Sequence, residues 1–296
     1  MRILLFIGVL LFAVGLYFPA NAQTLYGCQT PFGVNPFLYT INQNTGAALT
    51  TTEITLAGET VNGCTGMAKD PTTGVCWMIL NITEPETTNP RVLVTVDEDT
   101  GVATLIGDTG DAFSTIAFDA SGTLYGVTGD GANVPETLFT LSKTNGLPTF
   151  VQTLGNGDDG EAIAFNPVDG LLYHASGFGS LNINQIFETI NLQNGIVTPI
   201  SLSDDDSSET TALVFSGNNR FYMAEFAELG QITVGGSELF IADMDFDIKG
   251  LALDCGILGF PAEATIPTLS EWGLIAMATI LGIVGFMVMR RRKVTA

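Results

Sequence analysis

An aromatic residue recurs at nearly constant spacing along most of the chain, and this spacing constrains the fold more than any other feature. The aromatic residues lie at positions 26, 77, 125, 173 and 222, at intervals of 51, 48, 48 and 49 residues. Each belongs to a short run of alternating apolar and polar residues bounded by Gly, Asn and Asp, which is typical of a half-buried strand. A period near 49 residues with four such strands is the spacing of a β-propeller blade.

Two further segments accompany the aromatic strand in each repeat. Before it lies a segment that ends in Asp, Asn or Ser, and after it come a third strand, a turn with glycine and a Thr-rich fourth strand. The preceding segments are residues 66–70, 115–119, 162–166, 212–216 and 250–254. The third strands are residues 38–42, 93–97, 138–142 and 187–191, with the turn glycines Gly46, Gly101, Gly146 and Gly195.

The two ends of the repeat region predict how the ring closes. The region opens on a second strand, residues 24–28, and ends on an unpaired first strand, residues 248–254. Pairing these strands in one blade would remove the open edges that a propeller cannot expose. We therefore predict an all-β propeller of about five four-stranded blades over residues 23–261. Leu251 follows Leu213 by only 38 residues, so we expect one blade to lack a full outer strand.

The first 22 residues have the pattern of a signal peptide. Arg2 precedes an unbroken apolar run over residues 3–18, and the small residues Ala20 and Ala22 flank Asn21. These features predict cleavage by signal peptidase before Gln23. The alternative, an uncleaved transmembrane helix, needs about 20 apolar residues, which is longer than this run.

A second apolar run lies near the end of the chain. Residues 272–289 carry no charge, and the basic residues 290–293 follow at once. The run is long enough to span a bilayer, and the basic cluster predicts a cytoplasmic C-terminal end with Trp272 at the other interface. The alternative is a buried core helix. With the signal peptide, this predicted helix would hold the protein at the inner membrane, with its body facing the periplasm or cell surface.

A resemblance to a sorting signal follows from this end of the chain. Residues 266–273, IPTLSEWG, precede the apolar run and the basic tail, and the three parts together resemble the IPTL-CTERM signal of Gram-negative bacteria. That signal is similar to the PEP-CTERM signals read by exosortases. The resemblance covers residues 262–296 and implies a secreted protein that an exosortase-like sorting protease cleaves near Pro267 and transfers to the cell surface. The signal residues are Ile266, Pro267, Thr268, Leu269, Trp272, Gly273, Arg290, Arg291 and Arg292.

The body also resembles a known class of repeat, and its charge restricts the partners. The period of its strands is similar to that of NHL-type extracellular propellers. Residues 23–261 hold five Lys and Arg against 29 Asp and Glu, a net charge of −24. Nucleic-acid binding requires clustered basic residues, so this balance excludes a nucleic-acid partner.

Four cysteines, Cys28, Cys64, Cys76 and Cys255, lie in the part predicted to be exported. An oxidising compartment permits disulfides, and four cysteines allow three connectivities. Pairing Cys28 with Cys255 and Cys64 with Cys76 would link the strands within two hairpins. Each of these pairs, however, is about four residues off direct cross-strand register. Disulfides need Cα atoms within about 7 Å of each other. Pairing across blades is the alternative arrangement of disulfides. Free buried thiols and a zinc site are the remaining alternatives for these cysteines.

Clusters of acidic residues predict a possible calcium site, because calcium prefers carboxylate oxygens in turns. Asp158, Asp159 and Glu161 immediately precede the strand 162–166 and would lie near one mouth of the channel. The competing interpretation is that such residues are solvated turn residues bonded to their own backbone. The segment 97–101 aligns with 42–46 and favours that interpretation for its own cluster.

His174 is the single histidine, and it follows Tyr173 on a predicted second strand. A propeller enzyme could place such a residue at its channel, but no G-x-S-x-G elbow supports a hydrolase, and a polar strand residue is the simpler interpretation. The recurring aromatic residues are interpreted as packing between blades, with a carbohydrate-stacking surface as the alternative.

The sequence therefore favours a non-catalytic binding or structural module of the cell envelope, whose partner is an envelope protein or a glycan. A calcium-dependent propeller hydrolase, lyase or lactonase is the alternative, and a matrix component or adhesin is a third class. A propeller fold alone does not fix a function.

Overall fold

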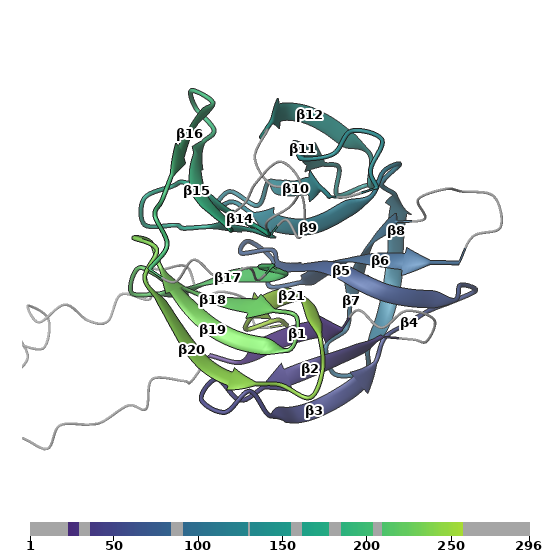
Figure 1. Ribbon diagram of the computed structural model, residues 1–296. Helices are drawn as coiled ribbons and strands as arrows, with labels where there is room; N and C mark the ends of the chain where they lie inside the picture. The colour runs from purple at the N-terminus through teal and green to yellow at the C-terminus, as the bar shows by residue number, and fades with distance from the viewer. Residues whose placement is uncertain are drawn as a thin grey trace, which may run out of the picture.

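The computed structural model describes residues 23–29, 36–83, 91–129, 131–154, 162–177, 185–203 and 209–256. These residues form 21 strands in five sheets arranged around a centre (Figure 1). The protein is therefore an all-β, five-bladed propeller, as the repeat predicts. The described residues contain no helix with the length and apolar character needed to cross a membrane. The predicted signal peptide, the predicted helix 272–289 and the sorting-signal residues lie outside the described residues.

Each blade is a four-stranded antiparallel sheet whose first strand lies at the centre of the ring. Blade 1 combines both ends of the repeat region, and blade 2 carries an additional short strand, β4, that pairs in parallel with its outer strand. The strands of blade 1, from the centre outward, are β21 (Ile248–Leu253), β1 (Leu25–Gln29), β2 (Phe37–Ile41) and β3 (Ala48–Glu53). Those of blade 2 are β5 (Val61–Lys69), β6 (Cys76–Ile82), β7 (Arg91–Val96), β8 (Val102–Asp108) and β4 (Thr55–Leu56).

The other three blades follow in sequence order around the ring, and their inner strands contact those of the neighbouring blades. Blade 3 contains β9 (Phe113–Phe118), β10 (Leu124–Thr128), β11 (Thr137–Leu141) and β12 (Pro148–Thr153). Blade 4 contains β13 (Ala162–Phe165), β14 (Leu172–Ser176), β15 (Ile186–Asn191) and β16 (Ile196–Pro199). Blade 5 contains β17 (Ala212–Gly217), β18 (Arg220–Glu225), β19 (Glu228–Thr233) and β20 (Glu238–Asp243).

The ring closes through the predicted pairing of its two ends. β1 pairs with β21 in antiparallel register, with Leu25 opposite Leu253 and Cys28 opposite Gly250. Thr24 and Asp254 extend the pairing, because the Thr24 amide donates to the Asp254 side chain at 2.8 Å and the Asp254 amide donates to the Thr24 carbonyl at 2.9 Å. All strands of the five blades thus lie between residues 25 and 253, so residues 23–256 contain a complete, closed ring.

The expectation that one blade lacks a full outer strand is wrong. Blade 5 has both outer strands, β19 and β20, and its short period has another cause. Only residues 226–227 connect its second and third strands, whereas seven to nine residues make this connection in the other blades. Phe226 takes a φ of 53° in this tight turn, and its amide donates to the Thr211 hydroxyl at 3.1 Å.

The turn between the third and fourth strands explains the repeated glycine. Gly46, Gly101, Gly146 and Gly195 all have φ between 67° and 77°, a region that residues with a side chain rarely enter. In blade 2, the Gly101 amide donates to the Asp97 carbonyl, and the Asp97 side chain accepts from the amide and hydroxyl of Thr100 at 2.8 and 2.7 Å. This confirms that the acidic segment 97–101 is a tight-turn element.

The recurring aromatic residues pack between blades, as expected. Trp77 of blade 2 meets Phe118 of blade 3 edge-on at 6.0 Å between ring centroids, and Tyr125 of blade 3 lies 5.2 Å from Phe165 of blade 4. These second-strand rings contact the inner strand of the next blade, and Tyr173 of blade 4 contacts Phe221 of blade 5 at 4.7 Å between ring centroids. The repeat thus packs neighbouring blades against one another.

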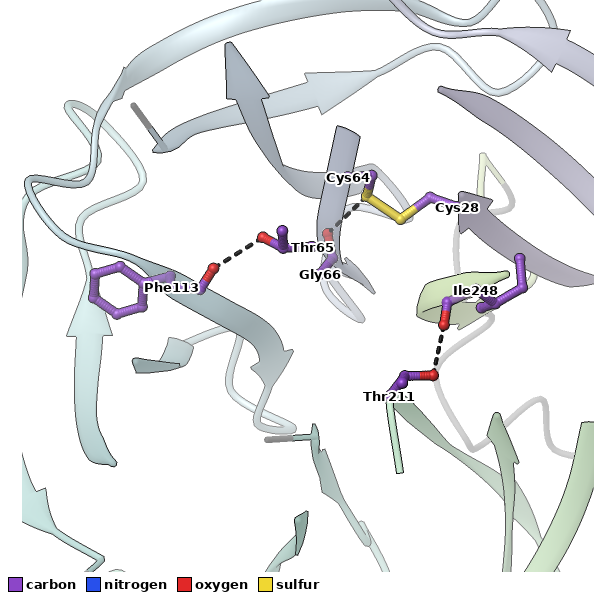
Figure 2. Close-up of a disulfide and its surroundings, with 7 residues drawn as sticks. All are labelled: Cys28, Cys64, Thr65, Gly66, Phe113, Thr211 and Ile248. Carbon is purple, nitrogen blue, oxygen red and sulfur yellow. Dashed lines mark hydrogen bonds between the residues drawn. A yellow bond between two sulfur atoms is a disulfide. The ribbon is translucent and has the colours of Figure 1, made fainter. Parts of the chain in front are cut away.

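The four cysteines form two disulfides that both join blade 1 to blade 2. Cys28 of β1 bonds Cys64 of β5, with Cα atoms 5.9 Å apart (Figure 2), and Cys76 of β6 bonds Cys255 just beyond β21, with Cα atoms 5.4 Å apart. The pairing within hairpins is therefore wrong and the pairing across blades is confirmed. The cause is register, since the direct cross-strand partner of Cys28 is Gly250 and that of Cys64 is Leu80.

Candidate functional site

A central cavity of about 580 Å³ opens where the five inner strands end. Three consecutive residues from each blade form its wall, so the repeat builds it with near five-fold regularity. The triplets are residues 67–69, 116–118, 163–165, 213–215 and 251–253. We call this space the central cavity and the side on which it opens the cavity face.

The composition of the triplets explains why the centre is hollow. The first position is Met, Ile or Leu, and the middle position is Ala in four blades and Val in the fifth. Small middle residues leave space that larger ones would fill, since protein interiors otherwise pack to near-crystalline density. The result is an apolar wall of the kind that ligand sites use.

The third position of the triplets contains the one basic side chain of the wall, Lys69. The equivalent residues in the other blades are Phe118, Phe165, Phe215 and Leu253. Burial lowers the pKa of the Lys69 ammonium, and the nearby Asp254 carboxylate partly offsets this by raising it. A half-buried amine in apolar surroundings is thus a distinctive electrostatic feature of the cavity.

Short side-chain turns support the rim, because in blades 2, 3 and 4 the polar residue after the inner strand accepts a hydrogen bond from backbone just beyond it. The Asp119 side chain accepts from the amides of Ser121 and Thr123, both at 2.9 Å. The Asn166 side chain accepts from the Val168 amide at 2.9 Å. The repeated Asp or Asn of the sequence is therefore a turn-forming residue at the cavity face.

His174 lies away from the cavity, inside blade 4. Its Nδ1 is 3.0 Å from Oε1 of Glu188 on the neighbouring strand, and both side chains are buried. Its Nε2 is buried without a hydrogen-bond partner among the described residues. The simpler interpretation, a polar strand residue, agrees with this placement, because solvent does not reach the imidazole.

The opposite side of the channel is held by polar contacts between blades. Thr65 of β5 donates to the Phe113 carbonyl of β9 at 2.9 Å, and Thr211 donates to the Ile248 carbonyl of β21 at 2.6 Å (Figure 2). Lys249 pairs with Glu209 at 2.8 Å. These contacts join neighbouring blades at the end of the inner strands that is remote from the cavity.

The calcium candidates Asp158, Asp159 and Glu161 lie outside the described residues. Within the parts of the chain that the structure describes, no three His, Cys, Asp or Glu side chains come together in a way that could hold a metal ion. The calcium prediction therefore stays a prediction.

Sequence reasoning missed two features of this region. One is the position of Lys69 in the cavity wall, which aligning the repeats would have revealed, since Lys replaces Phe or Leu there. The other is Glu188 as the partner of His174. The two residues are directly opposite on β14 and β15, and only the register of that hairpin, which the loop between the strands conceals, identifies the pair.

Comparisons with known proteins agree with both parts of the chain. Residues 264–292 match the IPTL-CTERM motif, which confirms the sorting signal and implies a sorting system related to that of PEP-CTERM and exosortase. No curated protein matches the chain. The protein thus combines a five-bladed β-propeller with a C-terminal sorting motif.

The chain is similar in structure to several solved proteins at low sequence identity. A chain from a nidogen/laminin complex has a TM-score of 0.51 at 12% identity, over 79% of this chain and 98% of that one. The PQQ-bound aldose sugar dehydrogenase of Streptomyces coelicolor has a TM-score of 0.45 at 11% identity, over 78% of this chain and 85% of that one. A gluconolactonase of Xanthomonas campestris has a TM-score of 0.43 at 13% identity, over 64% of this chain and 65% of that one. At these identities the likeness concerns the fold alone.

Proposed function

We propose that the protein is a non-catalytic binding module of the cell envelope whose central cavity takes a small, largely apolar ligand. The observation that carries this proposal is the cavity of about 580 Å³, walled by apolar triplets from all five blades. Ligand sites in proteins occupy roughly 300–1,000 Å³ and are mostly apolar with a few polar groups. The cavity has that size and composition.

The IPTL-CTERM motif and the two disulfides support a location outside the cytoplasm, because disulfides persist in oxidising compartments. In this proposal signal peptidase cleaves before Gln23, and the helix 272–289 anchors the protein until an exosortase-like protease processes it. The last described residue, Gly256, follows β21 on the cavity face. The chain that leads to the membrane anchor would therefore leave the propeller on the same face as the ligand site.

A fluorescence titration of residues 23–256 tests the binding function. The probe is N-phenyl-1-naphthylamine, a neutral dye that becomes fluorescent in apolar surroundings. Val214 lies in the cavity wall, so Val214→Trp fills part of the space. Leu49→Trp is the control, because Leu49 is 64% exposed on the outer strand β3.

We expect saturable binding to the unmodified propeller and to Leu49→Trp, and at least about tenfold weaker binding to Val214→Trp, which corresponds to about 1.4 kcal/mol. Equal binding by all three proteins would place the dye elsewhere and refute the proposal. A melting curve for each variant shows that the ring remains folded.

A further inference from the structure

The wall of the central cavity is asymmetric in charge. At its third triplet position, four blades present Phe or Leu and blade 2 presents Lys69. A propeller that needed only a packed core could place an apolar residue at this position in every blade, as the other four blades do. The single replacement puts one cationic group against an otherwise apolar wall.

Lys69 differs from the other two lysines of the propeller. Lys143 lies 3.0 Å from a carboxylate oxygen of Asp70, and Lys249 lies 2.8 Å from one of Glu209. Lys69 forms no ion pair with any residue in the described ranges. Burial lowers the pKa of its ammonium group, and the charge of Asp254 offsets this only in part, so an anion in direct contact with the ammonium would stabilise the charged form.

The two carboxylates at the cavity, Asp119 and Asp254, already accept hydrogen bonds from the backbone. Asp119 accepts from Ser121 and Thr123, and Asp254 accepts from Thr24. Asp119 holds a rim turn in place and Asp254 links β21 to the segment before β1. Together they add two negative charges beside a single ammonium group. This arrangement favours a ligand with one negative charge over one with two, because a dianion would be repelled by the rim.

From these observations we infer that the central cavity binds an aliphatic monocarboxylate, with its apolar chain against the triplets and its carboxylate on Lys69. This inference rests on the proposed function and names the ligand class of the same site. Each methylene buried against the wall raises the affinity about threefold to fourfold, and a charge-assisted hydrogen bond to the ammonium adds specificity for the acid group.

The test is isothermal titration of residues 23–256 with octanoate, 1-octanol and octyl phosphate in 150 mM NaCl, which screens the long-range field of the acidic surface. Lys69→Met keeps an unbranched side chain, one atom shorter than that of lysine, and removes its charge. Arg220→Met is the matched control, because it makes the same change in net charge at an exposed residue that does not line the cavity.

We expect octanoate to bind at least about tenfold more tightly than 1-octanol and octyl phosphate, as a charged hydrogen bond predicts. Lys69→Met should weaken octanoate about tenfold and leave 1-octanol unchanged, and Arg220→Met should change neither. Equal binding of octanoate and 1-octanol, tighter binding of octyl phosphate, or an unchanged affinity in Lys69→Met overturns the inference while the apolar binding site stands. If none of the three compounds binds and the dye also fails to bind, the proposed function itself is wrong.

Discussion

The hydroxyl of Tyr173 donates to Oδ2 of Asp169 at 2.9 Å beneath the cavity face. Burial, followed by this hydrogen bond and the charge of Asp169, raises the pKa of Tyr173 to about 12. An unfolded tyrosine has a pKa near 10. The folded state therefore holds the proton more strongly, and the stabilisation is complete below pH 10 and is lost as the pH rises towards 12.

Replacing Tyr173 with Phe removes this alkaline sensitivity. We expect the difference in unfolding free energy between the unmodified protein and Tyr173→Phe to shrink by about 1 kcal/mol between pH 9.5 and 11.5, a value reduced for solvent screening of the carboxylate. Urea titrations at several pH values measure the difference. Parallel stability curves for the two proteins would contradict the assignment.

At the scale of single residues, the sequence indicates residue types better than their partners. The turn role of Asp97 follows from its alignment with Asn42, because the hydrogen bonds of such turns are local in sequence. The pairing of His174 with Glu188 and the exposure of Lys69 to the cavity depend on strand register and on blade geometry. Neither is encoded within a few residues of the side chain concerned.

The inner strands approach each other closely enough to exclude a side chain at two glycine positions. A Cβ atom added to Gly66 of β5 would lie 2.7 Å from the Cα of Thr115 in β9, so backbone would have to move. A Cβ atom added to Gly250 of β21 would likewise lie 2.6 Å from the Met67 amide nitrogen. These glycines allow neighbouring blades to meet at the centre of the ring.

We therefore expect Gly66→Ala to lower the unfolding free energy by about 2 kcal/mol, the range found for overpacked cores. Gly235→Ala is the control, because the nearest atom to its added Cβ is the Thr233 hydroxyl at 3.9 Å, and its effect should stay within about 0.5 kcal/mol. Chemical denaturation of both variants measures the difference. Similar values for the two variants would show that β5 and β9 can separate without cost.

At the scale of strands, the repeat predicts most elements because each blade obeys the same alternation. It fails for blade 5, where the shortened period predicts an incomplete outer strand. The connection over residues 226–227 absorbs the difference instead. Phe226 takes a positive φ there, and a phenylalanine gives no sign of such a turn in the sequence. Loop length and strand loss produce the same spacing, so the spacing alone could not separate them.

At the scale of the whole molecule, the two disulfides fix the blade that closes the ring. They enclose separate segments, with separations of 36 and 179 residues. The chain-entropy model gives about 4 kcal/mol for the shorter loop and about 5 kcal/mol for the longer one. Because the segments do not overlap, the two contributions should be nearly additive.

Replacing Cys76 and Cys255 with Ser should therefore lower the melting temperature by about 10–20 °C, and replacing Cys28 and Cys64 by slightly less. Calorimetry of the two double variants and of the protein without any cysteine checks the order and the additivity. A double variant with the same melting temperature as the unmodified protein would show that hydrogen bonding between β1 and β21 is enough to close the ring. Reduction of the unmodified protein should reproduce the cysteine-free variant.

The Cys76–Cys255 bond also determines how the propeller responds to tension. Cys255 is the penultimate described residue, and it is bonded to the first residue of β6 in blade 2. A pull on the chain beyond Gly256 is therefore transmitted by a covalent bond to blade 2 before it loads the hydrogen bonds between β21 and β1. A propeller tethered by its C-terminal segment would therefore bear the force as one body. The disulfide would protect β21 from being separated from β1.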